Sequence, residues 1–344
     1  MEKKMSMNRR TLLSLGVAAG FASAFSRARA DDSPIESISL LSGQTSELAN
    51  YARPGEYGAP DAAVNVMVDI AGQHRRLFLY VPQKRTGNLV SVVFSHAELS
   101  SPKAYDGLLK HWASHGMLVI APLHDDSIVQ TGNQLGDDIH KVVDSVLLNE
   151  KVWKSRLNDC ERSLDCLPAI LQQSSMKTTG RAPIMAGHGL GAFTAQLLSG
   201  VRPGGRAWTS DTPLGADAFS AFLEMSPFGS GQAGLTPESF AGVGQPVLVA
   251  TGDADKDQFG ETGKEKMTAF SNLPAGYKHL LDLRTMNDGV FYGRNLNDLP
   301  TLYMRSVTTI FLRAYGLQDM STLRLLSGTT LSDEAQGEIT LAYR

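Results

Sequence analysis

A turn built on three glycines carries the clearest chemical signal in this chain. Gly187-His188-Gly189-Leu190-Gly191 follows the apolar segment 182–186 and precedes the helix-like segment 192–198. An apolar strand, a tight glycine turn and an apolar helix form the setting in which a G-x-S-x-G motif presents a nucleophilic serine. Gly189 stands where that serine is expected. The pattern therefore predicts the scaffold for serine chemistry without the attacking hydroxyl.

Strand-like and helix-like segments alternate through most of the chain. This alternation predicts an α/β fold with a mostly parallel central sheet and helices on both faces. From β-branched content and apolar periodicity we expect strands at 64–70, 77–81, 89–95, 117–121, 182–186, 219–225, 246–251 and 277–283, and helices at 105–115, 142–148, 156–172, 191–198 and 302–315.

Several ordered segments support a more specific resemblance. They are Val93-Phe94-Ser95-His96, like a strand ending in F-S-H-G; the strand and loop 118–124; Arg156 and Asp159, as R-x-x-D at a helix start; and 225–227, 235–240 and 246–255, the last like P-x-L-x-x-T-G-x-x-D. Together they resemble the α/β-hydrolase superfamily, and within it the chlorophyllase-like and platelet-activating-factor-acetylhydrolase-like branch, over about residues 77–317. The resemblance implies the α/β-hydrolase fold, which we expect as a single domain over 61–344.

The resemblance also implies three catalytic positions, of which only the acid is retained. The triad acid falls on Asp255 and the nucleophile falls on Gly189. The family's histidine loop, similar to G-A-D-H-x-x-F-x-G, corresponds to residues 285–293 and puts Asp288 in the base position. Loss of triad members lowers turnover by about 10⁶. We therefore expect ordinary esterase activity to be near background.

The same resemblance implies a binding role for the backbone around the turn. Oxyanion-type N–H groups are expected at Ala97 and Leu190, and Glu98 stands where glycine-rich residues usually follow the F-S-H strand end. The backbone N–H groups at a helix N-terminus can hold an anion or a carbonyl oxygen whatever the side chain is. No ligand spacing indicates a metal, and we expect no cofactor.

Two carboxylates would face each other if both loop alignments hold. Asp255 and Asp288 would then need a shared proton, a nearby cation or separation, because two close carboxylates do not both ionise readily. Arg284 is the candidate cation nearby in the sequence.

Four histidines have a structural interpretation beside a functional one. The related branch commonly carries histidine at the positions of His96 and His188 for packing and loop hydrogen bonds, although both are also candidate binding residues. His124 follows a strand end, where ligands bind in such sheets, but His124-Asp125-Asp126 also fits a solvated loop. We interpret His279 as structural or as a surface residue.

The two cysteines are not expected to form a disulfide. Cys160 and Cys166 lie on the predicted helix 156–172. Six residues of helix rise by roughly 9 Å, beyond the ~7 Å Cα limit for a bridge. Cys160 fits a core position, which makes it a poor replacement nucleophile. If the helix were broken between the two cysteines, a disulfide between them would become possible.

The N-terminus resembles an export signal. A basic region with adjacent Arg9 and Arg10, an apolar stretch over 11–25 and Ala28-Arg29-Ala30 predict a twin-arginine-type signal peptide over 1–30. The apolar stretch is shorter than the ~20 residues that span a bilayer, so we expect no membrane span in the mature protein. Residues 31–60, rich in Ser, Gly and Pro, are expected to form a loosely structured leader. The predicted location is the periplasm or the exterior.

Charge narrows the range of partners. The chain has a formal net charge of −3, and the predicted signal carries six basic residues and one acidic residue, so the remainder is at −8. A negative protein is a poor partner for nucleic acid or anionic membrane surfaces.

Three functions are compatible with these residues. The first is an exported protein that has lost serine-hydrolase catalysis and binds a small ester- or acid-like ligand, or serves an exported protein partner. The second is an active ester or lipid hydrolase with an unconventional site, drawn from Asp255, Asp288, Glu98 and His124. The third is a structural partner subunit whose cleft is collapsed or covered.

Overall fold

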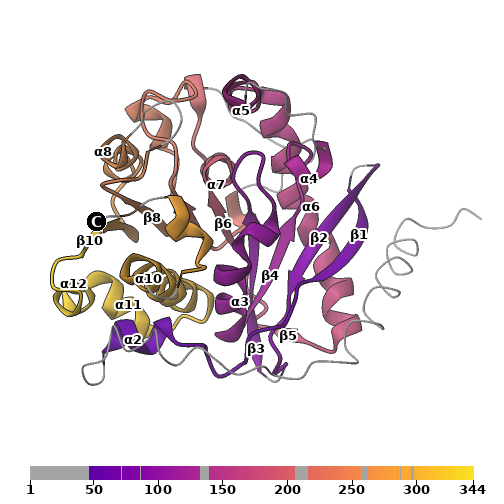
Figure 1. Ribbon diagram of the computed structural model, residues 1–344, viewed down its shortest axis with the longest axis horizontal. Coiled ribbons are helices and arrows are strands. Elements are labelled where there is room, and N and C mark those ends of the chain that lie inside the picture. The colour runs from indigo at the N-terminus through magenta and orange to yellow at the C-terminus, as the bar shows by residue number, and fades with distance from the viewer. Residues whose placement is uncertain are drawn as a thin grey trace, which may run out of the picture.

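Among the residues that the structure describes, ten strands form one mixed sheet that runs through the middle of the molecule, with helices on either side (Figure 1). The structure is a computed structural model, and it describes residues 46–70, 72–85, 87–131, 139–205, 216–256, 262–284, 286, 288–295 and 298–344. The predicted signal peptide and the first part of the predicted leader lie outside these residues.

The strands are β1 Val64–Ile70, β2 Gln73–Tyr80, β3 Asn88–Ser95, β4 Met117–Pro122, β5 Lys177–Thr178, β6 Ile184–His188, β7 Ala221–Met225, β8 Val247–Gly252, β9 Lys278–Leu283 and β10 Ile339–Tyr343. The α-helices are α2 Glu47–Ala52, α3 Asp106–Ser114, α4 Ile128–Thr131, α5 Ile139–Leu147, α6 Glu150–Ser174, α7 Leu190–Ser199, α8 Gly263–Lys266, α9 Thr268–Ser271, α10 Leu299–Gly316, α11 Met320–Ser327 and α12 Thr330–Glu334. Short 3₁₀ turns include η2 Pro102–Tyr105, η5 Pro237–Phe240 and η6 Asp288–Tyr292.

The middle of the sheet is parallel and its edges are antiparallel. The strand order is β1-β2-β4-β3-β6-β7-β8-β9-β10, with β5 beside β3. Strands β4, β3, β6, β7, β8 and β9 pair in parallel, whereas β1–β2, β2–β4 and β9–β10 pair antiparallel. This arrangement confirms the predicted α/β class with a mostly parallel central sheet.

Alternating side chains of the central strands build a hydrophobic core on each face of the sheet. Val92 and Phe94 of β3 pack with the cluster formed by α3 and α10. Val93, between them, belongs to the cluster that includes α6 and α7 residues on the other face. Successive side chains of a strand point to opposite faces, so a strand buried on both sides has a continuous apolar sequence. The prediction of helices on both faces is thereby confirmed.

Helix α6 is unbroken through both cysteines. Cys160 is buried in the same core cluster as α7, and Cys166 is buried against β1 and β2, and both are free thiols. The expected absence of a bridge between them is confirmed for the reason given by the helix geometry.

The expectation of a loosely structured leader is wrong for residues 46–60. Helix α2 lies in this segment and packs against α10, with the side chain of Leu48 only 1% exposed. The Glu334 carboxylate accepts hydrogen bonds from Ser46 Oγ at 2.8 Å and from the backbone N–H groups of Glu47 and Leu48 at 3.0 and 2.9 Å. An acidic group at these free N–H groups stabilises a helix N-terminus, and the partner is too distant in sequence to be read from the local pattern.

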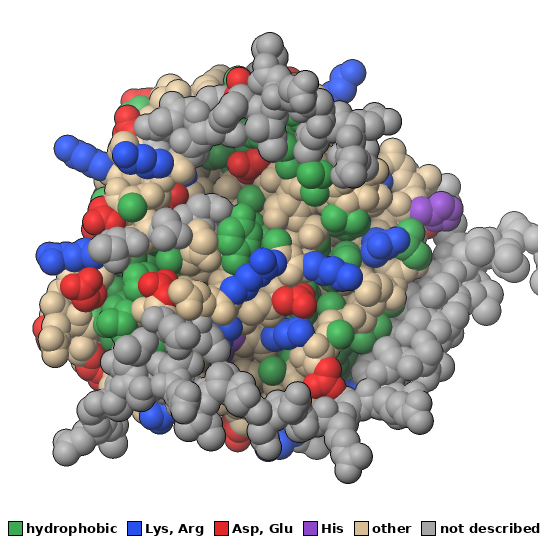
Figure 2. Space-filling view, in the orientation of Figure 1, with side chains coloured by type: hydrophobic (Ala, Val, Ile, Leu, Met, Phe, Trp, Pro, Cys, Tyr) green, Lys and Arg blue, Asp and Glu red, His purple; other side chains and the backbone are tan. Residues whose placement is uncertain are grey.

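The surface shows no field of one charge on the face seen in Figure 2. Lys and Arg side chains lie beside Asp and Glu side chains there. Within the described ranges, no helix is long and apolar enough to cross a membrane.

Substitution of Leu48 tests whether α2 belongs to the folded domain. We expect Leu48→Ala to lower the free energy of unfolding by about 2–4 kcal/mol, because it removes buried methyl groups and leaves a cavity. Urea unfolding measures the change. Asn50→Ala, at an exposed position of the same helix, is the control and should change it by less than about 0.5 kcal/mol. Equal small effects of both substitutions would show that α2 contributes little.

Candidate functional site

Strand β6, Gly189 and helix α7 form the strand, turn and helix that the sequence predicts here. Gly189 has φ 56° and ψ −120°, a backbone conformation that residues with a side chain adopt only under strain. Its N–H donates to the Met225 carbonyl at 3.0 Å, which ties the turn to β7. Gly191 is needed for a different reason, because a Cβ there would lie 2.0 Å from the Ser95 carbonyl oxygen. The turn therefore keeps a demanding geometry although no serine is present.

The Glu98 carboxylate fills the space beside Gly189. Leu190 N donates to Glu98 Oε2 at 3.2 Å. A Cβ at position 189 would lie 2.9 Å from the same oxygen and 3.3 Å from Ala97 Cβ. A carboxylate is stabilised by the N–H groups and the dipole at a helix N-terminus. One of the two predicted oxyanion-type donors is thus already bound to the chain's own acid.

The second predicted donor also has an internal partner. Ala97 N donates to the Tyr105 hydroxyl at 3.1 Å, and this hydroxyl lies 2.7 Å from His188 Nδ1. Both side chains are buried, and the His188 ring stacks near Phe291 of η6 at a centroid distance of 4.3 Å. These contacts give His188 the packing and hydrogen-bonding role that was one of its two interpretations.

A cavity of about 280 Å³ opens over this turn. It brings together five of the residues singled out in the sequence, Gly189, Ala97, Glu98, His188 and Asp255. The predicted base loop reaches it through Tyr292 of η6. Asp288 is the first residue of η6, and its side chain lies outside the described residues. The remaining lining residues are Leu147, Ser226, Phe228, Lys256 and Lys266.

Asp255 follows β8 and is almost fully buried among polar groups. Its carboxylate accepts from Thr251 Oγ1 at 2.7 Å and from Ser226 Oγ at 2.9 Å. Lys266 Nζ lies 3.2 Å from Asp255 Oδ1. Among the described residues, the cation on Asp255 is therefore Lys266 of α8, and not Arg284 as the sequence led us to expect. The short helix α8 has no sequence pattern that points to this contact.

Ser226 lies at the centre of this polar group. Its backbone has φ 50°, which is uncommon for a residue with a side chain, and its hydroxyl is hydrogen-bonded to both Asp255 and Lys266 Nζ. The Ser226, Asp255 and Lys266 side chains are at most 4% exposed. Because the Ser226 hydroxyl donates its hydrogen bond to the Asp255 carboxylate, and the lysine beside it is paired with the same carboxylate, neither group acts as a base toward this hydroxyl in the arrangement seen here.

A serine, a histidine and an aspartate that do not line the cavity are hydrogen-bonded to one another in the interior. Ser95 Oγ lies 2.8 Å from His124 Nε2, and His124 Nδ1 donates to Asp159 Oδ2 at 2.9 Å. The connectivity is that of a catalytic triad. All three residues are at most 1% exposed, so a substrate has no access. His124 is thus a buried residue and not part of a solvated loop.

Arg156 joins this buried network to the loop that carries Glu98. Its guanidinium pairs with Asp126 at 2.6 Å and donates to the carbonyls of His96 at 2.6 Å and Ala97 at 3.2 Å. The acid of the R-x-x-D pair, Asp159, is bound by Arg75, whose Nε lies 2.8 Å from Asp159 Oδ1. Arg156 of the R-x-x-D pair therefore positions the loop after β3, whereas Asp159 is held by Arg75 and His124.

Comparison of the chain with protein-family models found no matching model, and comparison with curated proteins found no match. Within the described residues, no group of three or more His, Cys, Asp or Glu side chains is placed to hold a metal ion.

Removal of the Lys266 charge should expose the cost of burying Asp255. We expect Lys266→Met to lower the free energy of unfolding by about 3–5 kcal/mol, because it leaves a buried carboxylate without its cation. Lys256→Met, at an exposed position in the same cavity, is the matched control and should have little effect. The double variant Lys266→Met with Asp255→Asn should regain part of the loss. A Lys266→Met protein as stable as the control would contradict the ion pair.

The buried histidines predict acid sensitivity. The pKa of His124 lies well below its usual 6.5, mainly because burial disfavours the charged ring and also because Arg156 is near, and the pKa of His96 is lowered by burial as well. The unfolded chain then binds more protons below pH 6.5, so the stabilisation present above that pH is lost as the pH falls. Each such histidine contributes a slope of up to about 1.4 kcal/mol per pH unit.

Urea unfolding between pH 7.5 and 5 measures this slope. His124→Gln should reduce this slope by up to about 1.4 kcal/mol per pH unit, the contribution of one histidine. His74→Gln, at an exposed position, should leave it unchanged. An unaltered slope in His124→Gln would show that this ring titrates normally.

Proposed function

We propose that this chain is an exported α/β-hydrolase-fold protein, of the chlorophyllase-like and platelet-activating-factor-acetylhydrolase-like branch, that has lost serine-hydrolase catalysis and binds a small ester- or acid-like ligand as an accessory protein. Three placements support the fold assignment: the tight turn at Gly189, the buried Asp255 after β8, and the η6 loop at the cavity. The proposed export rests on the twin-arginine-type segment over 1–30.

The contact between Glu98 and Leu190 carries the proposal of lost catalysis. In an active enzyme of this kind the N–H groups at this turn stabilise the oxyanion of the tetrahedral intermediate. Here the Leu190 N–H donates to a carboxylate of the same chain, beside a glycine with no nucleophile. In a hydrolase that relied on the Leu190 N–H, the Glu98 carboxylate would compete with the oxyanion of the intermediate for this donor.

The same contact indicates the chemistry of the ligand. A carbonyl or carboxylate oxygen can replace Glu98 Oε2 at the Leu190 N–H, because it offers the same acceptor. Lys256 supplies a cation at the exposed side of the cavity. A volume of about 280 Å³ lies at the small end of ligand pockets, which run from about 300 to 1,000 Å³, so the ligand has few heavy atoms.

A second function, hydrolysis through Ser226, is supported by the contact of its hydroxyl with Lys266. The Ser226 proton would pass to a neutral Lys266 amine while Oγ attacks the ester carbonyl, and the ammonium would then protonate the departing alkoxide, which leaves as the alcohol. Water would hydrolyse the acyl-serine to release the acid and restore Ser226. This function ranks second because Asp255 Oδ1, 3.2 Å from Lys266 Nζ, is already paired with the amine that would have to act as the base. Turnover of p-nitrophenyl butyrate that disappears in Ser226→Ala would establish it.

The primary proposal is tested by removing the internal occupant. Butyrate and methyl butyrate should both raise the melting temperature of the wild-type protein. In Glu98→Ala both should bind about five- to tenfold more tightly, because the ligand no longer competes with an internal hydrogen bond of about 1 kcal/mol. Glu238→Ala, at an exposed acid, is the control of equal charge.

Two results would contradict the proposal. One is the absence of any melting shift with either compound in both wild type and Glu98→Ala. The other is an equal gain in Glu238→Ala, which would trace the effect to net charge and not to the cleft. Methyl butyrate is uncharged, so its binding separates the cleft from any general attraction of anions.

A further inference from the structure

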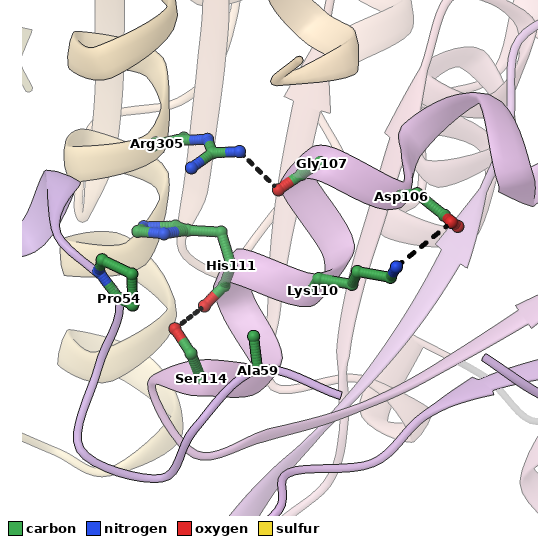
Figure 3. A pocket seen from close by; sticks show the side chains of 8 residues that line it. All are labelled: Pro54, Ala59, Asp106, Gly107, Lys110, His111, Ser114 and Arg305. Atoms are coloured by element: carbon green, nitrogen blue, oxygen red, sulfur yellow. Dashed lines mark hydrogen bonds and ion pairs between the residues drawn. The ribbon is translucent and has the colours of Figure 1, made fainter. Parts of the chain in front are cut away.

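A second cavity, of about 250 Å³, lies between α3, α10 and the segment that follows α2. It shares no residue with the cavity over Gly189. Figure 3 shows that its wall is formed by side chains from all three parts of the chain. They are Pro54, Ala59, Asp106, Gly107, Lys110, His111, Ser114 and Arg305.

Arg305 is a buried cation without an acidic partner in the described part of the chain. It is 8% exposed, and its hydrogen bonds run from Nη2 to the carbonyls of Gly107 at 2.8 Å and Gly293 at 2.5 Å. Its Nε has no hydrogen-bond partner. Burial lowers the pKa of the guanidinium to about 10, with no carboxylate to offset it. An uncompensated buried charge is costly, and a bound anion removes that cost.

His111 supplies a second unsatisfied polar atom in the same wall. The residue is 3% exposed, its Nε2 donates to the Tyr51 carbonyl at 2.9 Å, and its Nδ1 has no partner. Because Nε2 carries the proton, Nδ1 of the neutral ring is an acceptor that lacks a donor. In Figure 3 the side chains of Arg305 and His111 lie next to each other on this wall.

The other charged groups of the wall are already paired with each other. Lys110 Nζ lies 3.5 Å from Asp106 Oδ2, and Asp106 Oδ1 accepts from the Tyr80 hydroxyl at 2.7 Å. The Ser114 hydroxyl is used by the His111 carbonyl and by Gly55 N. The unmet requirement of the cavity is therefore one negative charge at Arg305, because the unpartnered His111 Nδ1 is closed to solvent.

We propose that this cavity binds a small oxyanion, with Arg305 as the residue that holds its charge. Guanidinium groups match the oxygens of phosphate and carboxylate in geometry and charge. Hydrogenphosphate fits best, because its double charge and its several oxygens offer the guanidinium the strongest acceptor. A carboxylate carries a single charge, so it binds more weakly. This inference does not depend on the function proposed for the cleft at Gly189.

Inorganic phosphate and acetate are the probes, added separately to the full chain at pH 7 and constant ionic strength. We expect phosphate to raise the melting temperature in a saturable way, with acetate weaker. Arg305→Gln should weaken phosphate binding by about ten- to hundredfold, the share of a charged hydrogen bond. Glutamine keeps an N–H donor for the carbonyls of Gly107 and Gly293, so this variant removes the charge and retains a hydrogen-bond donor to the backbone.

Two further variants keep the test decisive if Arg305→Gln folds poorly. Ala59→Phe fills the cavity from the segment after α2 and leaves Arg305 intact, so it should also abolish the phosphate effect. Arg324→Gln removes the same formal charge at an exposed site and should bind phosphate as the wild type does. Two results overturn the proposal: no saturable response in the wild type, or a response that Ala59→Phe and Arg305→Gln retain unchanged.

Discussion

The hydrogen bond from the Leu190 N–H to the Glu98 carboxylate determines the character of the cleft. It places a negative charge at the N-terminus of α7, where the free N–H groups and the helix dipole stabilise an anion. It also places that charge 2.9 Å from where a side chain at position 189 would begin. Glycine at 189 and glutamate at 98 therefore fit together in this arrangement, and a serine at 189 would require the Glu98 side chain to move.

Two further groups of contacts position residues of the cleft. Arg156 holds the loop of Ala97 and Glu98 through the carbonyls of His96 and Ala97, and Asp126 pairs with the arginine. Lys266 supplies the positive charge beside the buried Asp255. A triad acid is normally balanced by the histidine that it orients. In this structure the cation that balances Asp255 is Lys266.

The local features of this protein could be predicted from the sequence, whereas the contacts between distant segments could not. The strand, turn and helix around Gly189 follow from apolar periodicity and glycine spacing, which neighbouring residues encode. Asp255 was singled out by the resemblance of segment 246–255 to a family motif. The partner of Glu98 is 92 residues away, and the cation on Asp255 comes from a four-residue helix without a periodic pattern. Helix α2 was missed because its burial depends on α10 and Glu334.

Labelling with a fluorophosphonate probe tests the central claim most directly, because the probe reacts with activated serine hydroxyls. The native protein would be treated at pH 7.5 beside an active serine hydrolase, and labelled peptides would be identified by mass spectrometry. The account predicts labelling of the reference enzyme alone, since no serine stands at 189, Ser226 donates to Asp255, and Ser95 is buried. Stoichiometric labelling of Ser226, or of any other serine, would contradict it.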